Sequence, residues 1–384
     1  MTSPDMGKTI IGFDAKRIVR NATGLGNYSR TLVNDLAAVV PDDWRLKLYT
    51  PDAGREVLQS QIVESEQVQF VYPEHRPLKI QRSLWRIGPI VSDLKRDGVK
   101  LYHGLTGELP KGISAAGIRS VVTIHDLIFL RHPEYYNRLD VKIYDWKFRM
   151  ACREADRIIA ISERTKQDIM ELGGVSEDRI DVIYQSCSPR FQATTTPQQQ
   201  DEVRDRYQLP RRFVFSVGSI EERKNILLAV RALHHLPEDI HLVAVGRQTN
   251  YSQKTLKEAA GSGLEQRVHF LHNVPDSDLQ VLYQLAEVFV YPSRYEGFGI
   301  PIIEAIRSGL PVVAATGSCL EEAGGPDCLY VSPDDAEALA ASILKLLKGR
   351  PERERRIQHS REYVRRFEGN DVASQILDVY RRLL

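Results

Sequence analysis

The most informative segment of the chain is Ser293-Arg294-Tyr295-Glu296-Gly297-Phe298-Gly299-Ile300-Pro301-Ile302-Ile303-Glu304. An apolar run at residues 288–291 precedes it and predicts a buried strand. Pro301 fits the first turn of a helix, where its missing N–H is not needed. Gly309 and Pro311 end a helix. The segment therefore predicts a strand, a loop and a short helix from Ile300 to Ser308.

The loop and the start of this helix combine two carboxylates with backbone donors. Glu296 lies just before the helix, and Glu304 is predicted to face outward from its second turn. The N–H groups of Phe298, Gly299 and Ile300 have no partner within the helix, so they suit an anion or a hydroxyl-rich ligand. Two glutamates eight positions apart are also common by chance. A solvated helix face with a nearby loop carboxylate is the alternative interpretation.

Length and composition limit the possible classes of protein. A chain of 384 residues is too long for one ordinary core and predicts two or three domains. Its 42% hydrophobic and 27% charged residues are typical of a soluble globular protein. A net charge of +1 provides no overall field that would attract nucleic acid. Four scattered cysteines indicate reduced thiols in the cytoplasm, and without a signal peptide or spanning helix any membrane contact is expected to be peripheral.

Short apolar runs alternate with helical patterns along nearly the whole chain. The predicted strands are Thr9–Asp14, Leu46–Thr50, Val68–Tyr72, Leu101–Gly104, Ser120–His125, Arg157–Ile161, Asp181–Tyr184, Phe213–Val217, His241–Val245, Val268–Leu271, Val288–Tyr291, Pro311–Ala315 and Leu329–Val331. The polar segment Gln192–Gln200 divides them into two series and has the composition of a linker. Alternating strands and helices predict an α/β protein with two doubly wound parallel sheets. Ligands of such folds bind beyond the carboxyl ends of the strands, so we expect a cleft between the domains.

A glycine-containing segment follows the first predicted strand. Gly24 and Gly26 belong to a truncated dinucleotide-binding motif in which Ser29 occupies the third glycine position. Residues 15–21 make the gap after the strand too long for an NAD site. A loop before the predicted helix Tyr28–Val39 still suits contact with phosphate or substrate. A plain turn is the alternative.

Two histidines end predicted strands, where functional side chains are often found. Asp126 follows His125, and a neighbouring aspartate can raise the pKa of an imidazole or fix its orientation. His103 is the weaker candidate, because a lone histidine is often only a structural hydrogen-bonding group. The sequence contains no convincing cluster of metal ligands, and we expect no bound metal.

The second series of strands begins with residues 213–217, followed by Gly218 and the basic pair Arg223 and Lys224. A glycine and two cations ahead of a helix suit a diphosphate, with lysine as a point charge and arginine as a planar fork. The alternative is two exposed cations at a helix start. Because that placement opposes the helix dipole, binding is the better explanation.

Residues 78–94 place Ile80, Leu84 and further apolar residues on one helical face, with basic side chains elsewhere and Trp85 beside them. This pattern is consistent with a helix on a membrane surface. A core-packed helix with a solvated face is the more frequent explanation, and Pro89 interrupts the pattern.

One segment of the chain closely resembles the donor-site signature of the family 4 retaining glycosyltransferases. It consists of the strand, the Glu-Gly-Phe-Gly-Ile-Pro loop, the helix with Glu304 and the following Gly-Leu-Pro. The resemblance implies the GT-B fold, in which two Rossmann-like domains face each other across a cleft. It implies an N-terminal acceptor-binding domain at residues 1–190 and a C-terminal donor-binding domain at residues 205–366. A last helix at about residues 367–384 would pack back on the first domain.

The resemblance also implies roles for individual residues. Glu304 would hold the ribose, while Glu296 and the amides of the following loop would hold the donor sugar and its phosphates. His125 would contact the donor sugar near the reacting carbon. The remaining expected contacts are the glycine loop with Gly24 and Gly26, the phosphate region at Gly218, and the base-reading strand ends with Arg247 and Val274. The family usually has Arg or a small residue after the glycine and Lys at the position of Lys224. Here Ser219 stands in place of the Arg, so Arg223 is expected to supply the positive charge of that arginine.

The implied activity is a metal-independent, retaining transfer of a hexose, mannose or glucose, to a glycan or lipid-linked glycan in bacterial polysaccharide assembly. The donor would be a GDP- or UDP-linked sugar, used as co-substrate without a further cofactor. A cytoplasmic enzyme, with peripheral contact at the inner face of the cell membrane, would suit this activity. The alternatives are another GT-B enzyme, such as a sugar-nucleotide epimerase or a phosphorylase, and an inactive nucleotide-sugar-binding protein.

Overall fold

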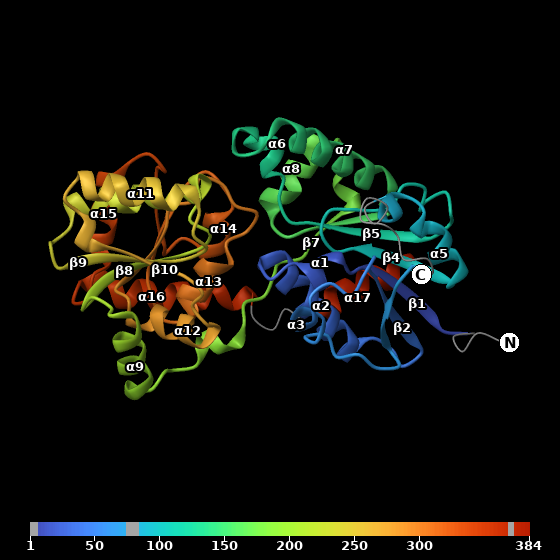
Figure 1. Cartoon of the computed structure of the whole chain (residues 1–384), viewed down its shortest axis with the longest axis horizontal. Helices are drawn as coiled ribbons and strands as arrows, with labels where there is room; N and C mark the ends of the chain where they lie inside the picture. The colour runs from blue at the N-terminus through green and yellow to red at the C-terminus, as the bar shows by residue number, and fades with distance from the viewer. Residues whose placement is uncertain (1–6, 74–83, 368–371) are drawn as a thin grey trace. The chain divides into compact units, whose positions relative to one another are not determined.

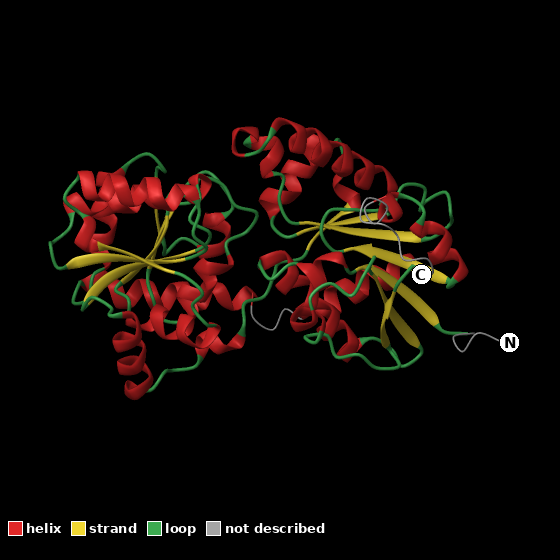
Figure 2. Ribbon diagram, in the orientation of Figure 1, coloured by secondary structure: helices red, strands yellow, loops and turns green. Residues whose placement is uncertain are grey.

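The computed structural model describes residues 7–73, 84–367 and 372–384. The chain divides into two compact units. Unit 1 comprises Met1–Gln185 and Asn370–Leu384, and unit 2 comprises Ser186–Gly369. Each unit contains a parallel sheet with helices on both faces (Figures 1 and 2).

The sheet of unit 1 has the strand order β3-β2-β1-β4-β5-β6-β7. Its strands are β1 (Thr9–Asp14), β2 (Trp44–Tyr49), β3 (Val68–Val71), β4 (Val99–Gly104), β5 (Arg119–Ile124), β6 (Arg157–Ala160) and β7 (Ile180–Val182). Its helices are α1 (Lys16–Arg20), α2 (Gly24–Val39), α3 (Glu56–Gln59), α5 (Ile90–Arg96), α6 (Ile128–Arg131), α7 (Arg138–Glu154), α8 (Glu163–Gly173) and α17 (Val372–Leu383).

The sheet of unit 2 has the order β10-β9-β8-β11-β12-β13. Its strands are β8 (Arg212–Val217), β9 (Ile240–Val245), β10 (Val268–Leu271), β11 (Val288–Tyr291), β12 (Val312–Ala315) and β13 (Leu329–Val331). Its helices are α9 (Pro197–Tyr207), α10 (Ile226–Ala232), α11 (Asn250–Gly261), α12 (Asp276–Leu285), α13 (Ile300–Arg307), α14 (Leu320–Gly324), α15 (Ala336–Leu346) and α16 (Pro351–Val364).

The prediction of two doubly wound parallel sheets is confirmed. Every predicted strand is present in the described residues, with its ends within two positions of the predicted ones. The agreement has a simple cause. Strands covered by helices on both faces need continuous apolar, β-branched sequence, and such runs are easy to find.

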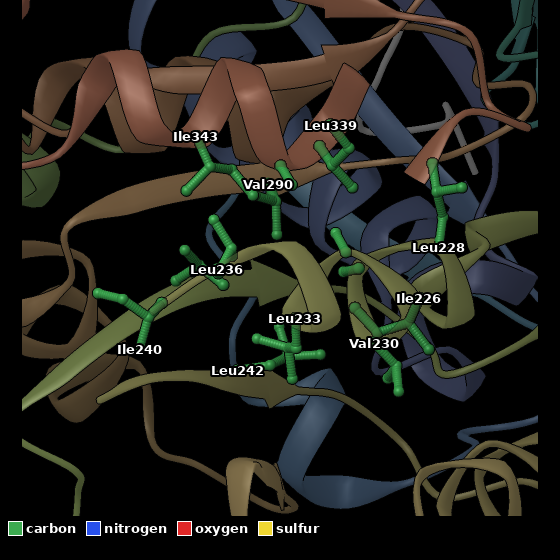
Figure 3. Close-up of a cluster of buried hydrophobic side chains, with 14 of the residues drawn as sticks. Ile226, Leu228, Val230, Leu233, Leu236, Ile240, Leu242, Val290, Leu339 and Ile343 are labelled. Atoms are coloured by element: carbon green, nitrogen blue, oxygen red, sulfur yellow. The ribbon is translucent and has the colours of Figure 1, made fainter. Parts of the chain in front are cut away.

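The core of unit 2 shows how these elements are joined. Ile226 and Val230 of α10 are buried together with Val290 of the central strand β11 and with Leu339 and Ile343 of α15 (Figure 3). Each fully buried side chain of this kind stabilises the fold by about 1.5–3 kcal/mol relative to an exposed one. The packing holds β8 and β11 in place from one side of the sheet.

Two segments differ from their predictions. The linker interpretation is wrong for residues 197–200, which form the first turn of α9. Thr196 and Gln199 form a capping box there, with Pro197 in the first turn, so the polar residues start a helix. The helix predicted at Tyr28–Val39 begins earlier, at Gly24, because Thr23 O accepts the N–H groups of residues 26 and 27.

Helix α17 packs beside α2 within unit 1 (Figure 1). The hydroxyl of Tyr380 forms a 2.6 Å hydrogen bond with His103 Nδ1, and His103 Nε2 forms a 2.8 Å hydrogen bond with Thr123 Oγ1. Burial lowers the pKa of His103 to about 3, so the ring is neutral. His103 therefore connects the C-terminal helix to the sheet.

The predicted helix at residues 78–94 lies partly outside the described residues, Ile80 included. Trp85 is buried, and its indole N–H donates to Asp93 at 2.8 Å. Helix α5 begins directly after Pro89 and buries Leu94. The described part of the segment is thus packed into the core, although Leu84 is exposed. Within the described ranges, no helix combines the length and hydropathy that crossing a bilayer requires.

Candidate functional site

The strand order of unit 2 reverses between β8 and β11, and this is where its candidate residues meet. Strand β8 pairs with β9 on one side and with β11 on the other, and β11 continues to β12. Chain segments leaving the carboxyl ends of β8 and β11 therefore diverge and leave room for a ligand. The first segment carries Arg223 and Lys224, and the second carries Glu296.

Glu296 forms ion pairs with both cations. Lys224 Nζ lies 2.5 Å from Glu296 Oε1, and Arg223 Nη1 lies 3.0 Å from Glu296 Oε2. Lys224 also donates to the hydroxyl of Tyr291 at 2.9 Å. Arg223 donates to the carbonyl oxygen of Tyr295 at 2.6 Å. Lys224 is 72 positions from Glu296 in the sequence and Arg223 is its neighbour, yet the three residues form one cluster.

The cluster keeps Glu296 ionised. Burial alone would raise the pKa of Glu296, but Lys224 and Arg223 lower it to about 2. The carboxylate in turn holds both cations in place and, although burial alone would lower it, raises the pKa of Arg223. Arg223 also pairs with Glu221 at 2.9 Å, so two carboxylates face the two cations. The ammonium and guanidinium groups are nevertheless the donors that suit a diphosphate.

The sequence did not indicate several residues that support this cluster. Ser293 donates a hydrogen bond to Glu296 Oε1, and the buried thiol of Cys319 lies 2.7 Å from the carbonyl oxygen of Phe298. Asn225 adopts φ +54° and donates to the carbonyl oxygens of Pro292 and Pro333. Tyr291 and Ser293 could have been found from their places at the end of β11. Cys319 follows β12, and no motif marks it.

The start of α13 provides the backbone donors predicted from sequence. Gly299 precedes the helix at φ +131°, a conformation that other residues rarely adopt. Within the described parts of the chain, the N–H groups of Gly299 and Ile300 have no acceptor. Phe298, the residue before Gly299, is buried. Ser318, at the end of neighbouring β12, has a buried hydroxyl without a hydrogen-bonding partner among the described residues.

The prediction that Glu304 faces outward is wrong. Its carboxylate is partly buried and accepts a hydrogen bond from Tyr283 at 2.8 Å. Burial raises the pKa of Glu304 to about 7, although the bond from Tyr283 opposes the shift. Tyr283 of α12 lies against this side of α13, and helical periodicity alone does not show which neighbour covers a helix face.

Three further predicted residues lie at the carboxyl ends of β8, β9 and β10. Gly218 has φ +143° and packs close to Lys224. Gly246 is packed so closely that a Cβ would lie 1.8 Å from Gly218 O. Arg247 is exposed, and its carbonyl oxygen accepts from Ile220 N. Val274 is partly buried beyond the end of β10.

His125, Gly24 and Gly26 belong to unit 1. His125 borders a cavity of about 240 Å³. The other residues lining it are Arg17, Leu25, Thr106, Gly107, Glu108, Ile124, Asp126, Leu127, Phe129, Tyr136, Tyr144, Lys147 and Phe148. A Cβ at Gly26 would lie 1.8 Å from Asn21 O, so this glycine is required by packing. Gly24 has open space around it.

Of the two effects that a neighbouring aspartate can have on His125, a raised pKa is not found. Burial lowers the pKa of His125 to about 4, and the ring is neutral at pH 7. Nε2 forms a 3.0 Å hydrogen bond with Leu105 O, and Nδ1 forms one with Gln185 Nε2 at 3.0 Å. Tyr28 packs edge-on against the ring at 4.7 Å. The imidazole is therefore held as a neutral hydrogen-bonding group at the edge of the cavity.

Comparisons with known proteins identify the family. The family model described as "Glycosyltransferase Family 4" matches residues 22–189, and "Glycosyl transferases group 1" matches residues 199–363. The chain is 30% identical to the O-antigen chain mannosyltransferase B of Escherichia coli over 292 residues, 74% of each protein. The chain belongs to the family 4 glycosyltransferases. The predicted resemblance is thereby confirmed.

Other relatives agree with this assignment. This glycosyltransferase is 26% identical to the O-antigen chain mannosyltransferase RfbU of Salmonella typhimurium strain LT2, over 66% of this chain and 67% of that protein. Its fold is similar to the crystal structure of a glycosyltransferase from Rickettsia africae ESF-5, with a TM-score of 0.76 and 20% identity over 98% of this chain and 99% of that one. The GT-B fold predicted from the motif is confirmed.

Proposed function

We propose that the enzyme transfers a hexose, with mannose favoured over glucose, from a nucleoside-diphosphate sugar to a glycan or lipid-linked glycan, with retention of configuration. The cluster of Arg223, Lys224 and Glu296 at the strand-order reversal of unit 2 carries this proposal. It combines two cationic side chains with backbone donors at the start of α13. A diphosphate with an attached sugar has the charge and the hydroxyl groups that such a site would bind.

The two cations would act mainly on the leaving group. As the bond between the anomeric carbon and the phosphate oxygen breaks, negative charge develops on the diphosphate. Lys224 and Arg223 are already charged and fixed by Glu296, so they would stabilise this charge without reorganisation. Side-chain cations can meet the charge of the diphosphate without a metal ion, which supports the metal-independent mechanism.

Retention would follow from attack on the same face of the sugar. The acceptor hydroxyl forms the new bond to the anomeric carbon as the diphosphate leaves, and the leaving phosphate oxygen takes the hydroxyl proton. His125 would contact the sugar through its neutral ring and would be no general acid, because its pKa is lowered. Leu105 O and Gln185 already occupy its two ring nitrogens, so this contact would not be a hydrogen bond from the imidazole.

Glu304 would accept hydrogen bonds from the ribose hydroxyls when ionised. Gly218, Arg247 and Val274 would border the nucleotide at the neighbouring strand ends. GDP and UDP are both candidate carriers. The O-antigen mannosyltransferase relatives support mannose as the sugar and polysaccharide assembly as the process. The acceptor would bind at the cavity of unit 1 beside His125, near the turn that carries Gly24 and Gly26.

The test combines binding with product analysis. A thermal-shift panel with UDP, GDP and ADP identifies the base, and the matching sugar nucleotides are then incubated with and without acceptor glycans. We expect GDP-mannose to be consumed, with an α-linked product that appears only when acceptor is present. Conversion of the donor without acceptor into an epimer or a sugar phosphate would instead support an epimerase or a phosphorylase. Donor binding with no chemistry would support a binding protein.

A further inference from the structure

The cavity of unit 1 lies where the strand order of its sheet reverses. Strand β1 pairs with β2 on one side and with β4 on the other, and β4 continues to β5. Residues that follow the carboxyl ends of three strands line the cavity. They are Arg17 after β1, Thr106 and Glu108 after β4, and Asp126 after β5. Because such a reversal leaves room for a ligand, the cavity has the position of a binding site within unit 1 alone.

Three aromatic rings line part of this cavity. Phe129 belongs to α6, Tyr136 follows that helix, and Tyr144 belongs to α7. The ring centroid of Phe129 lies 5.6 Å from that of Tyr144 and 6.5 Å from that of Tyr136, both in edge-on contact. Tyr144 is 39% exposed, and its hydroxyl forms no hydrogen bond within the described ranges. The rings hold one another in place and offer an apolar surface for the C–H groups of a ligand.

Charged side chains also line the cavity, and among the described residues their formal charges cancel. Arg17 and Lys147 are cations, and Glu108 and Asp126 are carboxylates. Burial keeps His125 neutral by lowering its pKa to about 4. A lining without net charge suits a neutral ligand better than a phosphate group, which would need an excess of cations.

Glu108 is held by cations from two other segments. Lys147 Nζ donates to Glu108 Oε1 at 3.0 Å, and Nη2 of Arg86 lies 3.0 Å from Glu108 Oε2. The side chain of Arg86 is 7% exposed, and its Nε donates to Asp14 at 3.1 Å. Burial alone would raise the pKa of Glu108, but Arg86 and Lys147 lower it to about 2. The carboxylate is therefore ionised, and each oxygen still has a lone pair for a ligand hydroxyl.

The backbone around Glu108 is fixed as well. A Cβ at Gly104 would lie 2.0 Å from Glu108 O, so the chain returns on itself tightly at this point. Gly107 has φ +78°, and its N–H donates to Thr123 O at 2.9 Å. A side chain fixed by both its ion pairs and its backbone binds a ligand without the cost of ordering it.

The cavity also offers donors that the protein itself does not use. Within the described ranges, the side chains of Arg17 and Thr106 form no hydrogen bond. Together with the carboxylate of Glu108, they provide donors and an acceptor around one space. A ligand with several hydroxyl groups can use both kinds of partner, because a hydroxyl both donates and accepts.

Size and composition limit the ligand further. The volume of about 240 Å³ is below the roughly 300–1,000 Å³ typical of pockets for drug-sized ligands, and it suits one sugar ring. A lipid chain would need an apolar channel, whereas this cavity contains charged side chains. A pyranose combines an apolar C–H face with hydroxyl groups at its edge, and so matches both the aromatic and the polar lining.

We propose that this cavity binds the terminal sugar ring of a neutral glycan, with Tyr144 against the C–H face of the ring and Glu108 accepting hydrogen bonds from its hydroxyl groups. Glu108 and Tyr144 would then determine which acceptors the enzyme uses. The enzyme would extend an existing glycan and would not use a lipid phosphate or a simple alcohol. The sugar's role as acceptor rests on the proposed function, whereas its binding to the cavity does not.

Binding is measured first, without any donor. Saturation-transfer NMR of the full-length protein uses methyl α-mannopyranoside and methyl α-glucopyranoside as neutral probes and mannose 6-phosphate as the charged one. We expect saturation of ring protons in at least one neutral probe and about tenfold weaker binding of the phosphate. An excess of GDP or UDP should not displace the probe. Binding of no neutral probe, preference for the phosphate, or displacement by the nucleotide would overturn the proposal.

Two substitutions of Tyr144 separate its ring from its hydroxyl. Tyr144→Ala should weaken binding of the neutral probe by about two- to tenfold, whereas Tyr144→Phe should bind as the wild type does. The matched control is Trp146→Ala, because Trp146 is an exposed aromatic residue of α7 that does not line the cavity. If Tyr144→Ala and Trp146→Ala had equal effects, Tyr144 would not contact the sugar.

Glu108→Gln tests the hydroxyl contacts with deoxy sugars. The wild type should bind at least one monodeoxy derivative of the preferred probe about tenfold more weakly than the parent, because a hydrogen bond to a charged group is lost. Glu108→Gln should weaken the parent probe to a similar degree and abolish the difference between the two. Asp140→Asn, at an exposed carboxylate in the first turn of α7, is the control. A folded Glu108→Gln protein that still discriminates against the deoxy sugar would contradict the assignment.

Circular dichroism and thermal unfolding verify that each variant is folded. If Glu108→Gln does not fold, the Tyr144 pair and the deoxy sugars with the wild type still decide the proposal. A transfer assay then separates it from the proposed function. Sugar binding as expected without any consumption of donor would refute the proposed function and leave the sugar site intact. Transfer with an acceptor KM that neither Tyr144→Ala nor Glu108→Gln changes would refute the sugar site and leave the proposed function intact.

Discussion

Lys224 is the residue whose loss should separate chemistry from folding most cleanly. Its ammonium group contacts Glu296 and Tyr291, and Arg223 stays on Glu296 when it is removed. We expect Lys224→Met to lower kcat by about 10²–10³-fold, the usual effect of removing one group that stabilises transition-state charge. The measurement is steady-state transfer from the donor sugar nucleotide.

The matched control is Lys254→Met, which removes an exposed lysine from α11 in the same unit. It should leave kcat within twofold of the wild type, roughly the scatter expected for a surface change. If Lys224→Met retained full kcat with only a higher KM, Lys224 would contribute to ground-state binding alone. That result would contradict the leaving-group role.

Glu304 should make donor binding depend on pH. Its pKa of about 7 lies above the ordinary value of 4.5, so the carboxylate is half protonated near neutrality. Ribose hydroxyls donate to the ionised form, and nucleotide affinity should therefore rise about five- to tenfold between pH 6 and pH 8. Calorimetric titration of the bound nucleoside diphosphate at several pH values measures this. Glu304→Gln should bind more weakly and show a flat profile.

The same carboxyl group links stability to pH. Because the folded pKa is raised, the folded state binds a proton that the unfolded state has released between pH 4.5 and pH 7. The contribution of Glu304 to stability is therefore complete below about pH 4.5 and is lost as pH rises through 7. Relative to Glu304→Gln, the wild type should lose on the order of 2 kcal/mol of unfolding free energy across this window. Denaturant unfolding of both proteins at pH 5 and pH 8 would reveal it.

At the scale of elements, the start of α2 allows a test with a built-in control. A Cβ at Gly26 would overlap Asn21 O, whereas a Cβ at Gly24 would meet nothing within 4 Å. We expect Gly26→Ala to destabilise unit 1 by about 2–3 kcal/mol, the range of overpacking in a closely packed site. Gly24→Ala should change the stability by less than about 1 kcal/mol. Thermal unfolding compares the two, and equal effects would contradict the packing role of Gly26.

The helices and strands also show which features sequence patterns predict and which they do not. The strands were predictable because helices cover both faces and impose continuous apolar runs. The start of α2 and the helix α9 were not predicted, because glycines and a glutamine-rich segment suggest loops. Helix α9 begins at a capping box whose bonds join the side chains of Thr196 and Gln199 to the backbone, whereas α2 begins with backbone bonds from residues 26 and 27 to Thr23 O. Composition alone contains neither kind of bond.

The candidate site was predictable to a similar degree. The family motif named Glu296, Glu304 and the amides before α13, and the basic pair followed from its place after a strand. Contacts between distant segments were not predictable from local patterns. They include the ion pairs from Arg223 and Lys224 to Glu296, the bond from Tyr283 to Glu304 and the buried thiol of Cys319. The orientation of His125 also depends on Leu105 and Gln185, far away in sequence.

At the scale of the whole molecule, each unit has its own hydrophobic core, and only unit 2 holds the proposed nucleotide site. Calorimetry of the full chain should therefore show two transitions. A nucleoside diphosphate at a hundredfold excess over its Kd adds about 2.7 kcal/mol to the unit that binds it. The midpoint temperature of the unit 2 transition should rise by roughly 5–10 °C, while that of unit 1 should not change.

A substitution in unit 1 should affect only the unfolding transition of unit 1. Tyr380→Phe removes the hydroxyl partner of His103 Nδ1 and leaves a buried polar atom without a bond, at a cost of about 1–3 kcal/mol. The midpoint temperature of the unit 1 transition should fall by a few degrees, and that of the nucleotide-dependent transition should not change. Val379→Ala should lower the midpoint temperature of the same transition, because it leaves a cavity in the core. It should not offset the loss in Tyr380→Phe, because the two losses arise from different contacts on α17. A single transition that responds to both the nucleotide and Tyr380→Phe would show that the two cores unfold together, and would contradict the independence argued from their separate packing.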